Sequence, residues 1–320
     1  MKALYCSSYG KIEDLTYGEI SNPEVAPDEV MIQVRYSGVN FPDTLIVEGK
    51  YQFKPDLPFA PGGEVAGTIE RVGAEVKELK KGDTVIAAMG WGGFSEYAVA
   101  KASNTYVFPE SGNLKKGAVL LETYGTALYG LKNRGALDKG ETLLVLGASG
   151  GTGQAAIQIG KVLGAKIIAI ASSEGKRALA KENGADIVLG YDKMLKAQLK
   201  ELGGVDVIFD PVGGEVSEQV FRSLRPGGRH LVVGFASGKI PQISWNLPLL
   251  KSAAIIGVFW GHFWRNQPMQ NRENIYQLIA WLSKGAINPY ISKEFDLKDG
   301  KLALKQIMNR EAKGKIILQP

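Results

Sequence analysis

Cysteine and histidine are scarce in this chain of 320 residues, which contains one cysteine, Cys6, and two histidines, His230 and His262. A single cysteine cannot form a disulfide within the chain, and an unpaired thiol is typical of a reducing compartment. A catalytic zinc ion needs three protein ligands, mostly cysteine, histidine or carboxylate, and a structural zinc ion typically needs four cysteines. The composition therefore argues against both kinds of zinc site, and we expect no metal.

Long apolar segments are also missing. The longest candidate, AAIIGVFWGHFW at 253–264, is shorter than the roughly 20 residues that span a bilayer, and it contains His262. The first residues, MKALYCSSYG, lack the apolar segment that a secretory signal requires. We therefore expect a cytoplasmic protein that does not enter a membrane.

Positive charge is in slight excess, because 38 lysines and arginines face 33 acidic residues and give a net charge of +5. The lysines are scattered over predicted helical surfaces and turns such as KELKKGD, and no arginine-rich stripe or RNA-binding aromatic motif occurs. This distribution is typical of a solvated surface and argues against a nucleic acid partner.

Two kinds of segment pattern divide the chain. Residues 1–121 contain short runs of β-branched residues punctuated by glycine and proline, which predict antiparallel strands in a compact, barrel-like unit. In residues 122–260, short apolar runs alternate with helical patterns, as in a doubly wound parallel sheet. Residues 261–320 hold two amphipathic helices and a closing strand, which could not bury their apolar faces alone. We predict an α/β fold in which this last part returns to the first domain.

A glycine-rich turn, LLVLGASGGTGQAA at 143–156, lies at the first strand-to-helix junction of the predicted sheet. A diphosphate can approach the backbone N–H groups of the helix N-terminus only where side chains are absent. Ala148, Gly150 and Gly153 occupy the three positions of the dinucleotide-binding fingerprint, with alanine in place of the first glycine. A P-loop is disfavoured because GTGQ stands where Gly-Lys-Ser/Thr is required. The predicted dinucleotide-binding residues are Ala148, Ser149, Gly150, Gly151, Thr152 and Gly153.

The end of the second strand of this sheet predicts which dinucleotide binds. NAD enzymes usually carry an acidic residue there, which binds the ribose hydroxyls and repels a 2′-phosphate. This chain instead has Ser172 and Ser173, then Lys176, and Tyr191 after the next strand could close the same pocket. These side chains predict NADPH, whereas Glu174 would favour NADH if it turned inward rather than capping the helix. Lys176 and Tyr191 could alternatively belong to an ordinary helix surface and strand edge.

Several motifs together resemble one protein family. They are GVNFPDTLIVEGKYQFKPDLPFAPGGEVAGTIERVG at 38–73, GASGGTGQAAIQIGKVLGAKIIAIASSEGK at 147–176, FDPVGG at 209–214 and LRPGGRHLVVGFASG at 224–238. The set is similar to the zinc-free quinone oxidoreductases, or zeta-crystallin-like proteins, of the medium-chain dehydrogenase/reductase superfamily. This resemblance implies a GroES-like catalytic domain at 1–121 and 261–320, a Rossmann domain at 122–260, NADPH, a homodimer, and reduction of quinones or related α,β-unsaturated carbonyl compounds.

The resemblance also assigns individual residues. It implies that Asn40 and Asp43 of NFPD lie in the cleft beside the nicotinamide. Glu64 stands where zinc-containing relatives have Gly-His-Glu and is interpreted as a structural carboxylate, and Leu45 replaces a tyrosine found in several quinone reductases. The other residues expected near the cofactor are Thr126, Phe235, Ser237, Phe259, Trp260 and Arg310.

Tyr51, Asn40 and Asp43 are the candidate catalytic residues. Tyr51 matches the tyrosine that enoyl thioester reductases of the superfamily use as proton donor; a quinone can instead take protons from water, and Tyr51 could equally be a packing residue. Asn40 could bind the acceptor carbonyl or the nicotinamide ribose, or simply form a turn before Phe41. Three functions remain open: an NADPH-dependent quinone or enone reductase, an enoyl thioester reductase, and a crystallin-like protein that binds NADPH without turnover.

Overall fold

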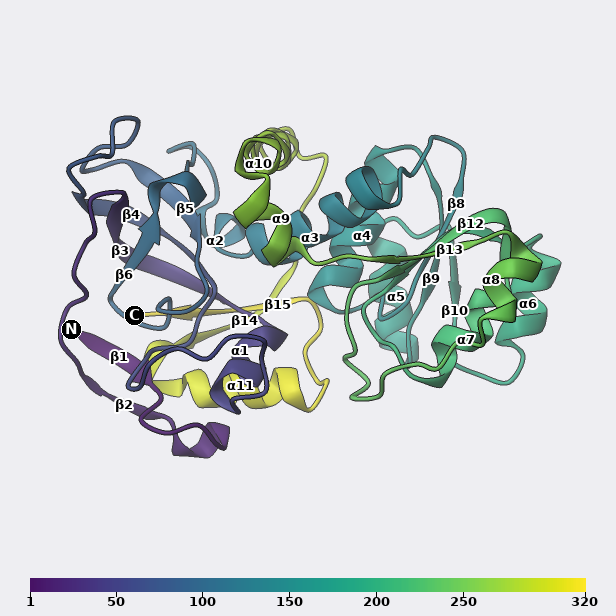
Figure 1. The fold of residues 1–320 in the computed structure, drawn as a ribbon, viewed down its shortest axis with the longest axis horizontal. Coiled ribbons are helices and arrows are strands. Elements are labelled where there is room, and N and C mark those ends of the chain that lie inside the picture. The colour runs from purple at the N-terminus through teal and green to yellow at the C-terminus, as the bar shows by residue number, and fades with distance from the viewer. The chain divides into compact units, whose positions relative to one another are not determined.

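A computed structural model describes all 320 residues, which form two compact units. Unit 1 comprises Met1–Glu122, Pro268–Ser283 and Pro289–Pro320, and unit 2 comprises Thr123–Gln267 and Lys284–Asn288. Unit 1 is rich in antiparallel strands and unit 2 contains a parallel sheet covered by helices (Figure 1). The predicted α/β fold class, a doubly wound parallel sheet with a β-rich second domain, is confirmed.

The sheet of unit 2 has six parallel strands in the order β10-β9-β8-β11-β12-β13. Their bounds are β8 Thr142–Val145, β9 Lys166–Ile170, β10 Ile187–Leu189, β11 Val205–Asp210, β12 Leu224–Val232 and β13 Ala254–Gly257. The strand order reverses direction between β8 and β11, which is the point where doubly wound sheets bind ligands beyond the carboxyl ends of their strands. All four residues of β8 are buried, as expected for a strand covered on both faces.

Helices cover both faces of this sheet (Figure 1). They are α4 Gly151–Val162, α5 Glu174–Glu182, α6 Leu195–Glu201, α7 Glu215–Phe221 and α8 Asn246–Lys251, and a further helix of unit 2, α9 Trp260–Asn266, follows β13. Three further helical segments precede β8: η3 Leu121–Gly125, α3 Thr126–Leu128 and η4 Tyr129–Arg134. Leu144, Ile168 and Ile208 of the strands pack with Phe221 of α7 in one buried core. Alternation of strand and helix thus turns each strand's carboxyl end toward one edge of the sheet.

Unit 1 is built on a seven-stranded sheet in which β14-β15-β3-β4-β5-β7 are neighbours and β6 also pairs with β3. Its strands are β3 Glu29–Val39, β4 Glu64–Val72, β5 Thr84–Ala88, β6 Tyr97–Lys101, β7 Thr105–Val107, β14 Ile291–Asp296 and β15 Lys315–Gln319, and a separate pair consists of β1 Lys2–Tyr5 and β2 Thr16–Glu19. The C-terminal strand β15 is antiparallel to β3, with Ile316 opposite Val39. This register places the start of β15, at Lys315, beside the end of β3, next to Asn40.

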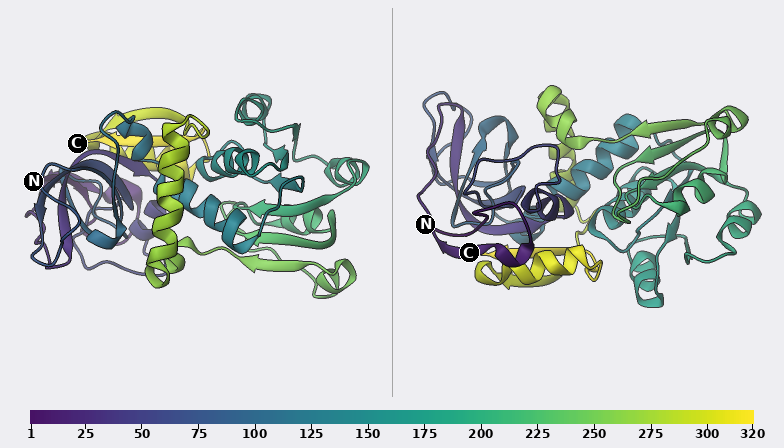
Figure 2. Two further views of the ribbon diagram at one scale, coloured as in Figure 1. Left: turned by 90° about the horizontal axis from the view of Figure 1, so that it is seen from above. Right: turned by 60° about the horizontal axis from the view of Figure 1, so that its bottom comes forward.

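The helices of unit 1 are α1 Phe41–Val47, α2 Leu114–Gly117, α10 Pro268–Ser283 and α11 Gly300–Met308, and short 3-10 turns occur at Ile12–Asp14, Ala102–Asn104 and Leu297–Asp299. Helix α11 lies beside α1 (Figure 2), and both bury apolar residues, including Ile46 and Leu304, in the same core as Leu4 and Leu318. No helix of the structure has both the length and the apolar character that a membrane span requires.

Candidate active site

The glycine-rich turn follows the central strand β8 and leads directly into α4. Gly147 has a φ of 60°, a left-handed conformation that favours glycine, and Gly150 is the residue that precedes the helix. A Cβ atom on Gly153 would lie 2.3 Å from the carbonyl oxygen of Gly147, so no side chain fits there. The turn is therefore tight enough to require glycine at Gly147 and Gly153, as the sequence predicted from the strand before it and the helix after it.

The backbone of this turn leaves N–H groups at the start of α4. The amides of Ala148 and Gly150 donate to the carbonyl oxygens of Ile170 and Gly147, at 3.1 and 3.0 Å. Gly151, Thr152 and Gly153 open the helix, where amides have no intrahelical acceptor and the helix dipole is positive. This arrangement suits an anionic diphosphate. Ser149 is itself buried, and its carbonyl oxygen accepts a hydrogen bond of 2.8 Å from the side chain of Gln154.

The serines beyond β9 lie at the start of α5. Ser172 is exposed, and the Ser173 hydroxyl accepts a hydrogen bond of 3.4 Å from the amide of Lys176 and so caps the helix. The Ser173 hydroxyl keeps its own hydrogen for donation to another acceptor. Glu174 is exposed in the first helical turn, where a carboxylate interacts favourably with the helix dipole. Glu174 is thus the first residue of α5, which matches the alternative in which it stands at the start of the helix rather than turning inward, while Ser173 is the capping residue.

Tyr191 joins the second-strand region to the glycine-rich turn. Its hydroxyl oxygen accepts a hydrogen bond of 2.8 Å from the amide of Gly147. The hydroxyl is desolvated, although 39% of the residue is exposed, and this raises the pKa of Tyr191 to about 12. The phenol therefore stays protonated and still has a hydrogen to donate. Of the four residues predicted around a 2′-phosphate, Tyr191 is the one that contacts the turn directly.

Five of the residues predicted near the nicotinamide belong to unit 2: Thr126, Phe235, Ser237, Phe259 and Trp260. Phe235 and Phe259 are 38% and 44% exposed, whereas Trp260 is buried against the backbone of Gly125. The hydroxyl of Ser237 donates to the carbonyl oxygen of Lys239 at 3.2 Å. Thr126 begins α3 and is partly exposed. Trp260 therefore has a clear packing role, and the two phenylalanines present accessible rings.

Asp210 fixes the loop that follows β11. Its carboxylate accepts hydrogen bonds from the amides of Val212 and Gly213, at 2.9 and 2.8 Å, and from the hydroxyl of Ser217. The ring of His230 lies 3.0 Å from the same carboxylate. Burial alone would raise the pKa of Asp210, but these hydrogen bonds lower it overall. The group holds FDPVGG rigidly, which the motif match did not predict.

In unit 1, Asn40 and Asp43 lie at the start of α1 and are both buried, with 6% and 1% of the residue exposed. The Asp43 carboxylate accepts a hydrogen bond of 2.7 Å from the amide of Asn40. The Asn40 side chain donates to Glu64 at 2.9 Å and accepts from Lys315. Both predicted residues therefore belong to one internal network rather than to an exposed surface.

Glu64 and Lys315 form the centre of this network, with their side chains 1% and 4% exposed and 3.0 Å apart. The ammonium group of Lys315 also donates to the carbonyl oxygen of Val39. A Cβ atom on Gly38 would lie 2.5 Å from a carboxylate oxygen of Glu64, so this glycine makes room for the pair. The interpretation of Glu64 as a structural carboxylate was made without Lys315, which lies 251 positions away in the sequence.

Glu122 completes the group, which we call the carboxylate cluster: Asn40, Asp43, Glu64, Glu122 and Lys315. The amide of Glu122 donates to the Glu64 carboxylate at 3.0 Å. The carboxyl of Glu122 lies over Gly63, and a Cβ atom on Gly63 would be 2.9 Å from one of its oxygens. Burial and the neighbouring carboxylates raise the pKa of Glu122 to about 8. Our sequence analysis missed Glu122 and Lys315. A single acidic residue inside the apolar run AVLLETYGTALYG is the signal that could have identified Glu122.

Tyr51 lies in a loop of unit 1 that is rich in aromatic residues. Its ring meets the ring of Phe53 edge to face, with 4.9 Å between centroids, and Phe53 lies 5.7 Å from Trp91. Tyr51 is partly buried and Trp91 is 44% exposed. Arg310 is exposed just beyond α11, with a φ of 59°.

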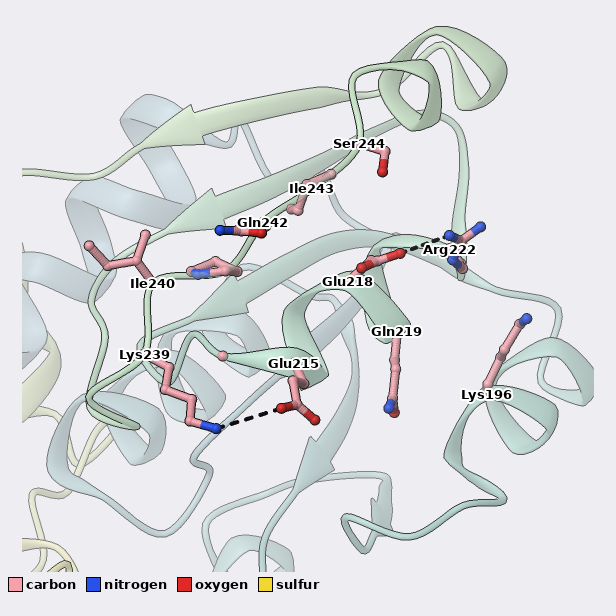
Figure 3. Close-up of a pocket in the computed structure, with 12 residues that line it drawn as sticks. Lys196, Glu215, Glu218, Gln219, Arg222, Lys239, Ile240, Gln242, Ile243 and Ser244 are labelled. Atoms are coloured by element: carbon pink, nitrogen blue, oxygen red, sulfur yellow. Dashed lines mark hydrogen bonds and ion pairs between the residues drawn. The ribbon is translucent and has the colours of Figure 1, made fainter.

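A pocket of about 750 Å³ lies between α7 and the segment 239–244 of unit 2 (Figure 3). Charged pairs lie along it, with Lys239 3.6 Å from Glu215 and Arg222 2.8 Å from Glu218. None of the predicted site residues lines this pocket. Because it lacks the glycine-rich turn and the other predicted site residues, we do not assign it to the cofactor.

No group of three or more histidine, cysteine or acidic side chains is arranged to hold a metal ion. The Glu64 carboxylate already accepts four hydrogen bonds, two at each oxygen, from Asn40, Lys315, Leu121 and Glu122. Cys6 is buried in unit 1, and His230 is occupied by Asp210. These donors do not suit a zinc ion.

Comparison with known proteins is consistent along the whole chain. Residues 26–110 match the model of the alcohol dehydrogenase GroES-like domain, and residues 151–284 match that of the zinc-binding dehydrogenases. Bovine (Bos taurus) quinone oxidoreductase-like protein 2 is 36% identical over 95% of this chain and 88% of its own length. Quinone oxidoreductase of Mus musculus is 35% identical over 99% and 97%. The structure of Escherichia coli quinone oxidoreductase complexed with NADPH is 26% identical, with a TM-score of 0.93 and full coverage of both chains.

Proposed function

Because the chain belongs to the quinone oxidoreductases of the medium-chain dehydrogenase/reductase superfamily, we propose that it is an NADPH-dependent reductase of quinones or related α,β-unsaturated carbonyl compounds. The observation that carries this proposal is the closed glycine turn at the N-terminus of α4, where Gly153 leaves no space for a side chain. Relatives with NADPH bound support the choice of cofactor. The bound nicotinamide would supply the hydride.

The residues of unit 2 would bind and orient the cofactor. Amides of Gly151, Thr152 and Gly153 would receive the diphosphate. Ser172, Ser173, Lys176 and Tyr191 would bind the 2′-phosphate, because the Ser173 and Tyr191 hydroxyls each retain a hydrogen to donate and Lys176 supplies positive charge. The remaining cofactor contacts that we propose are Ala148, Ser149, Asn40, Thr126, Phe235, Ser237, Phe259, Trp260 and Arg310.

The residues of unit 1 would hold the acceptor and the proton. A quinone or enone that accepts hydride gains negative charge on oxygen, so a nearby acid lowers the barrier. Tyr51 is one candidate acid, and its place in the aromatic group with Phe53 and Trp91 also suits contact with a flat ring. Asn40 and Asp43 would act from inside the carboxylate cluster, by orienting its charged groups.

We further propose that the reaction needs no zinc. The lone pairs of Glu64 are taken by N–H donors, and the Lys315 ammonium already supplies the positive charge that this carboxylate requires. Zinc bound at Glu64 would also need two more ligands, usually histidine or cysteine. Unit 1 contains no histidine, and Cys6 is its one cysteine.

A homodimer is the proposed assembly. Strand β13 ends the sheet of unit 2, so one of its edges has unpaired backbone groups that a second copy could bind. Apolar side chains are exposed near this edge: Trp245 by 86%, Leu249 by 78%, Leu250 by 73% and Ile255 by 40%. Light scattering after size-exclusion chromatography would give twice the chain mass of 34.5 kDa.

The function is tested by following NADPH oxidation with three acceptors: 1,4-benzoquinone, a 2-alkenal and crotonyl-CoA. We expect turnover with the quinone or the alkenal. Preference for crotonyl-CoA would favour an enoyl thioester reductase instead. NADPH binding without turnover of any acceptor would favour the crystallin-like alternative, and absence of NADPH binding would contradict the proposal outright.

A further inference from the structure

Three carboxyl groups and only one cation meet inside unit 1. Asp43 comes from α1, Glu64 from β4, Glu122 from η3 and Lys315 from β15. If all four were ionised, the cluster would carry two uncompensated negative charges away from water, which is costly. At least one carboxyl is therefore expected to hold a proton at neutral pH.

Hydrogen bonds identify Glu64 as an ionised group. One of its oxygens accepts from Asn40 at 2.9 Å and from Lys315 at 3.0 Å. The other accepts from the amides of Leu121 and Glu122, at 3.1 and 3.0 Å. These four N–H donors, one of which is the buried ammonium of Lys315, stabilise the carboxylate form of this side chain. The single positive charge of the cluster is therefore matched by Glu64.

Glu122 has the opposite surroundings. No hydrogen bond or ion pair to its carboxyl is present in the structure, and the ionisable groups that face it are Glu64, Asp43 and Lys315. Burial first, and then the two neighbouring carboxylates, raise the pKa of Glu122 to about 8, against the opposing effect of Lys315. The residue remains partly exposed, unlike Asp43, of which 1% is exposed. Glu122 therefore keeps its proton at neutral pH and is not fully shielded from solvent.

We propose that Glu122 is the general acid that protonates the acceptor, an inference that rests on the proposed reductase function. Hydride transfer from NADPH adds two electrons and one hydrogen to the acceptor and leaves one oxygen negatively charged. The proton on the Glu122 carboxyl then moves to that oxygen, and the Glu122 carboxylate takes a new proton from water. The sum is one NADPH and one proton consumed for each acceptor reduced, with NADP⁺ as the other product.

Two features favour Glu122 over Tyr51 in this role. An acid works best when its pKa lies near the operating pH, and that of Glu122 is closer to neutrality than a phenol's ordinary value near 10. Glu122 also belongs to the carboxylate cluster, together with Asn40 and Asp43, the two residues predicted beside the nicotinamide. Gly63 leaves the space that the carboxyl occupies, so the position of the acid is set by the backbone of the PGGEVAG motif.

The test uses Glu122→Gln, which keeps the shape of the neutral acid but has no proton to donate to oxygen at comparable acidity. Glu110→Gln, at an exposed position of unit 1, is the matched control. The first readout needs no cofactor: ¹³C NMR of glutamate-labelled protein should show one carboxyl that titrates near pH 8 in the wild type and in E110Q, and its absence in E122Q. A wild-type protein whose glutamates all titrate near their ordinary value would overturn the proposal.

The second readout is turnover. With a 2-alkenal, E122Q should lower kcat by about 10²-fold to 10⁴-fold while NADPH affinity stays unchanged, and the loss with 1,4-benzoquinone should be smaller because water can protonate a hydroquinone anion. The kcat/KM of the wild type should fall above about pH 8, and this limb should disappear in E122Q. If the wild type is active and E122Q has the same kcat, only the assignment of Glu122 as the acid is overturned. If the wild type is inactive with every acceptor, the proposed function is overturned.

Discussion

The amide of Gly147 donates a hydrogen bond of 2.8 Å to the hydroxyl of Tyr191, which lies 44 positions further along the chain. Gly147 begins the glycine-rich turn, and Tyr191 follows β10 at the outer part of the sheet. The bond connects the region proposed for the diphosphate with that proposed for the 2′-phosphate. It makes Tyr191 a residue that shapes the turn as well as a candidate ligand.

Replacing Tyr191 by phenylalanine should weaken NADPH binding by about tenfold, because one hydrogen bond to the turn and one potential phosphate donor are lost. Isothermal titration calorimetry with NADPH and NADH checks this. NADH binding should weaken less, since only the support of the turn is lost. Unchanged affinity for both dinucleotides would exclude Tyr191 from the site.

Lys176→Met should reduce the preference for NADPH over NADH by roughly tenfold to a hundredfold, the effect of one charged hydrogen bond of about 1.5–3 kcal/mol. Lys200→Met, on the exposed surface of α6, is the control and should leave the ratio unchanged. The ratio of the two dissociation constants is the measurement. An equal ratio in wild type and K176M would mean that Lys176 is an ordinary helix-surface residue that does not bind the 2′-phosphate.

Lys315→Met should lower the free energy of unfolding by about 3–5 kcal/mol, because it leaves the Glu64 carboxylate buried without its counter-charge. The double variant K315M/E64Q should recover part of this loss. Lys305→Met breaks an exposed pair with Glu13 and should cost less than about 1 kcal/mol. Urea unfolding measures all three. A cost for K315M no greater than that of K305M would contradict the central position of the Glu64–Lys315 pair.

Asp43 should make the folded state less stable as pH rises. Burial raises the pKa of Asp43 to about 7 from an ordinary value of 3.8, so between these values the folded chain keeps a proton that the unfolded chain has lost. The free energy of unfolding should therefore fall with rising pH in this window, with at most about 1.4 kcal/mol per pH unit due to this group.

Asp43→Asn should make that pH dependence shallower, and the exposed control Asp56→Asn should not. Urea unfolding at several pH values between 5 and 7.5 gives the slopes. Parallel slopes for D43N and the wild type would mean that Asp43 is ionised in the folded protein throughout this range.

Local patterns account for the parts of the protein that the sequence could predict. The spacing of apolar residues predicts both the strand before Gly147 and the helix after Gly150. The lack of space for a side chain at Gly153 follows from the short turn between that strand and that helix. The position of Glu174 at the start of α5 was one of two alternatives and depends on neighbouring residues alone. The α/β fold class follows from the same alternation.

Contacts distant in sequence account for what could not be predicted. Lys315 reaches Glu64 only because β15 pairs with β3, a register that no local pattern specifies. The protonation of Glu122 depends on two carboxyls from other elements. Trp260 was expected near the cofactor because of the family resemblance, but its burial against Gly125 is set by tertiary packing.

The most direct test of the account is calorimetric titration of the wild-type protein with NADPH and, separately, with NADH. Anchoring of the 2′-phosphate by Ser173, Lys176 and Tyr191 predicts a dissociation constant for NADPH that is tenfold to a hundredfold lower than for NADH. Absence of heat with NADPH, or tighter binding of NADH, would contradict it.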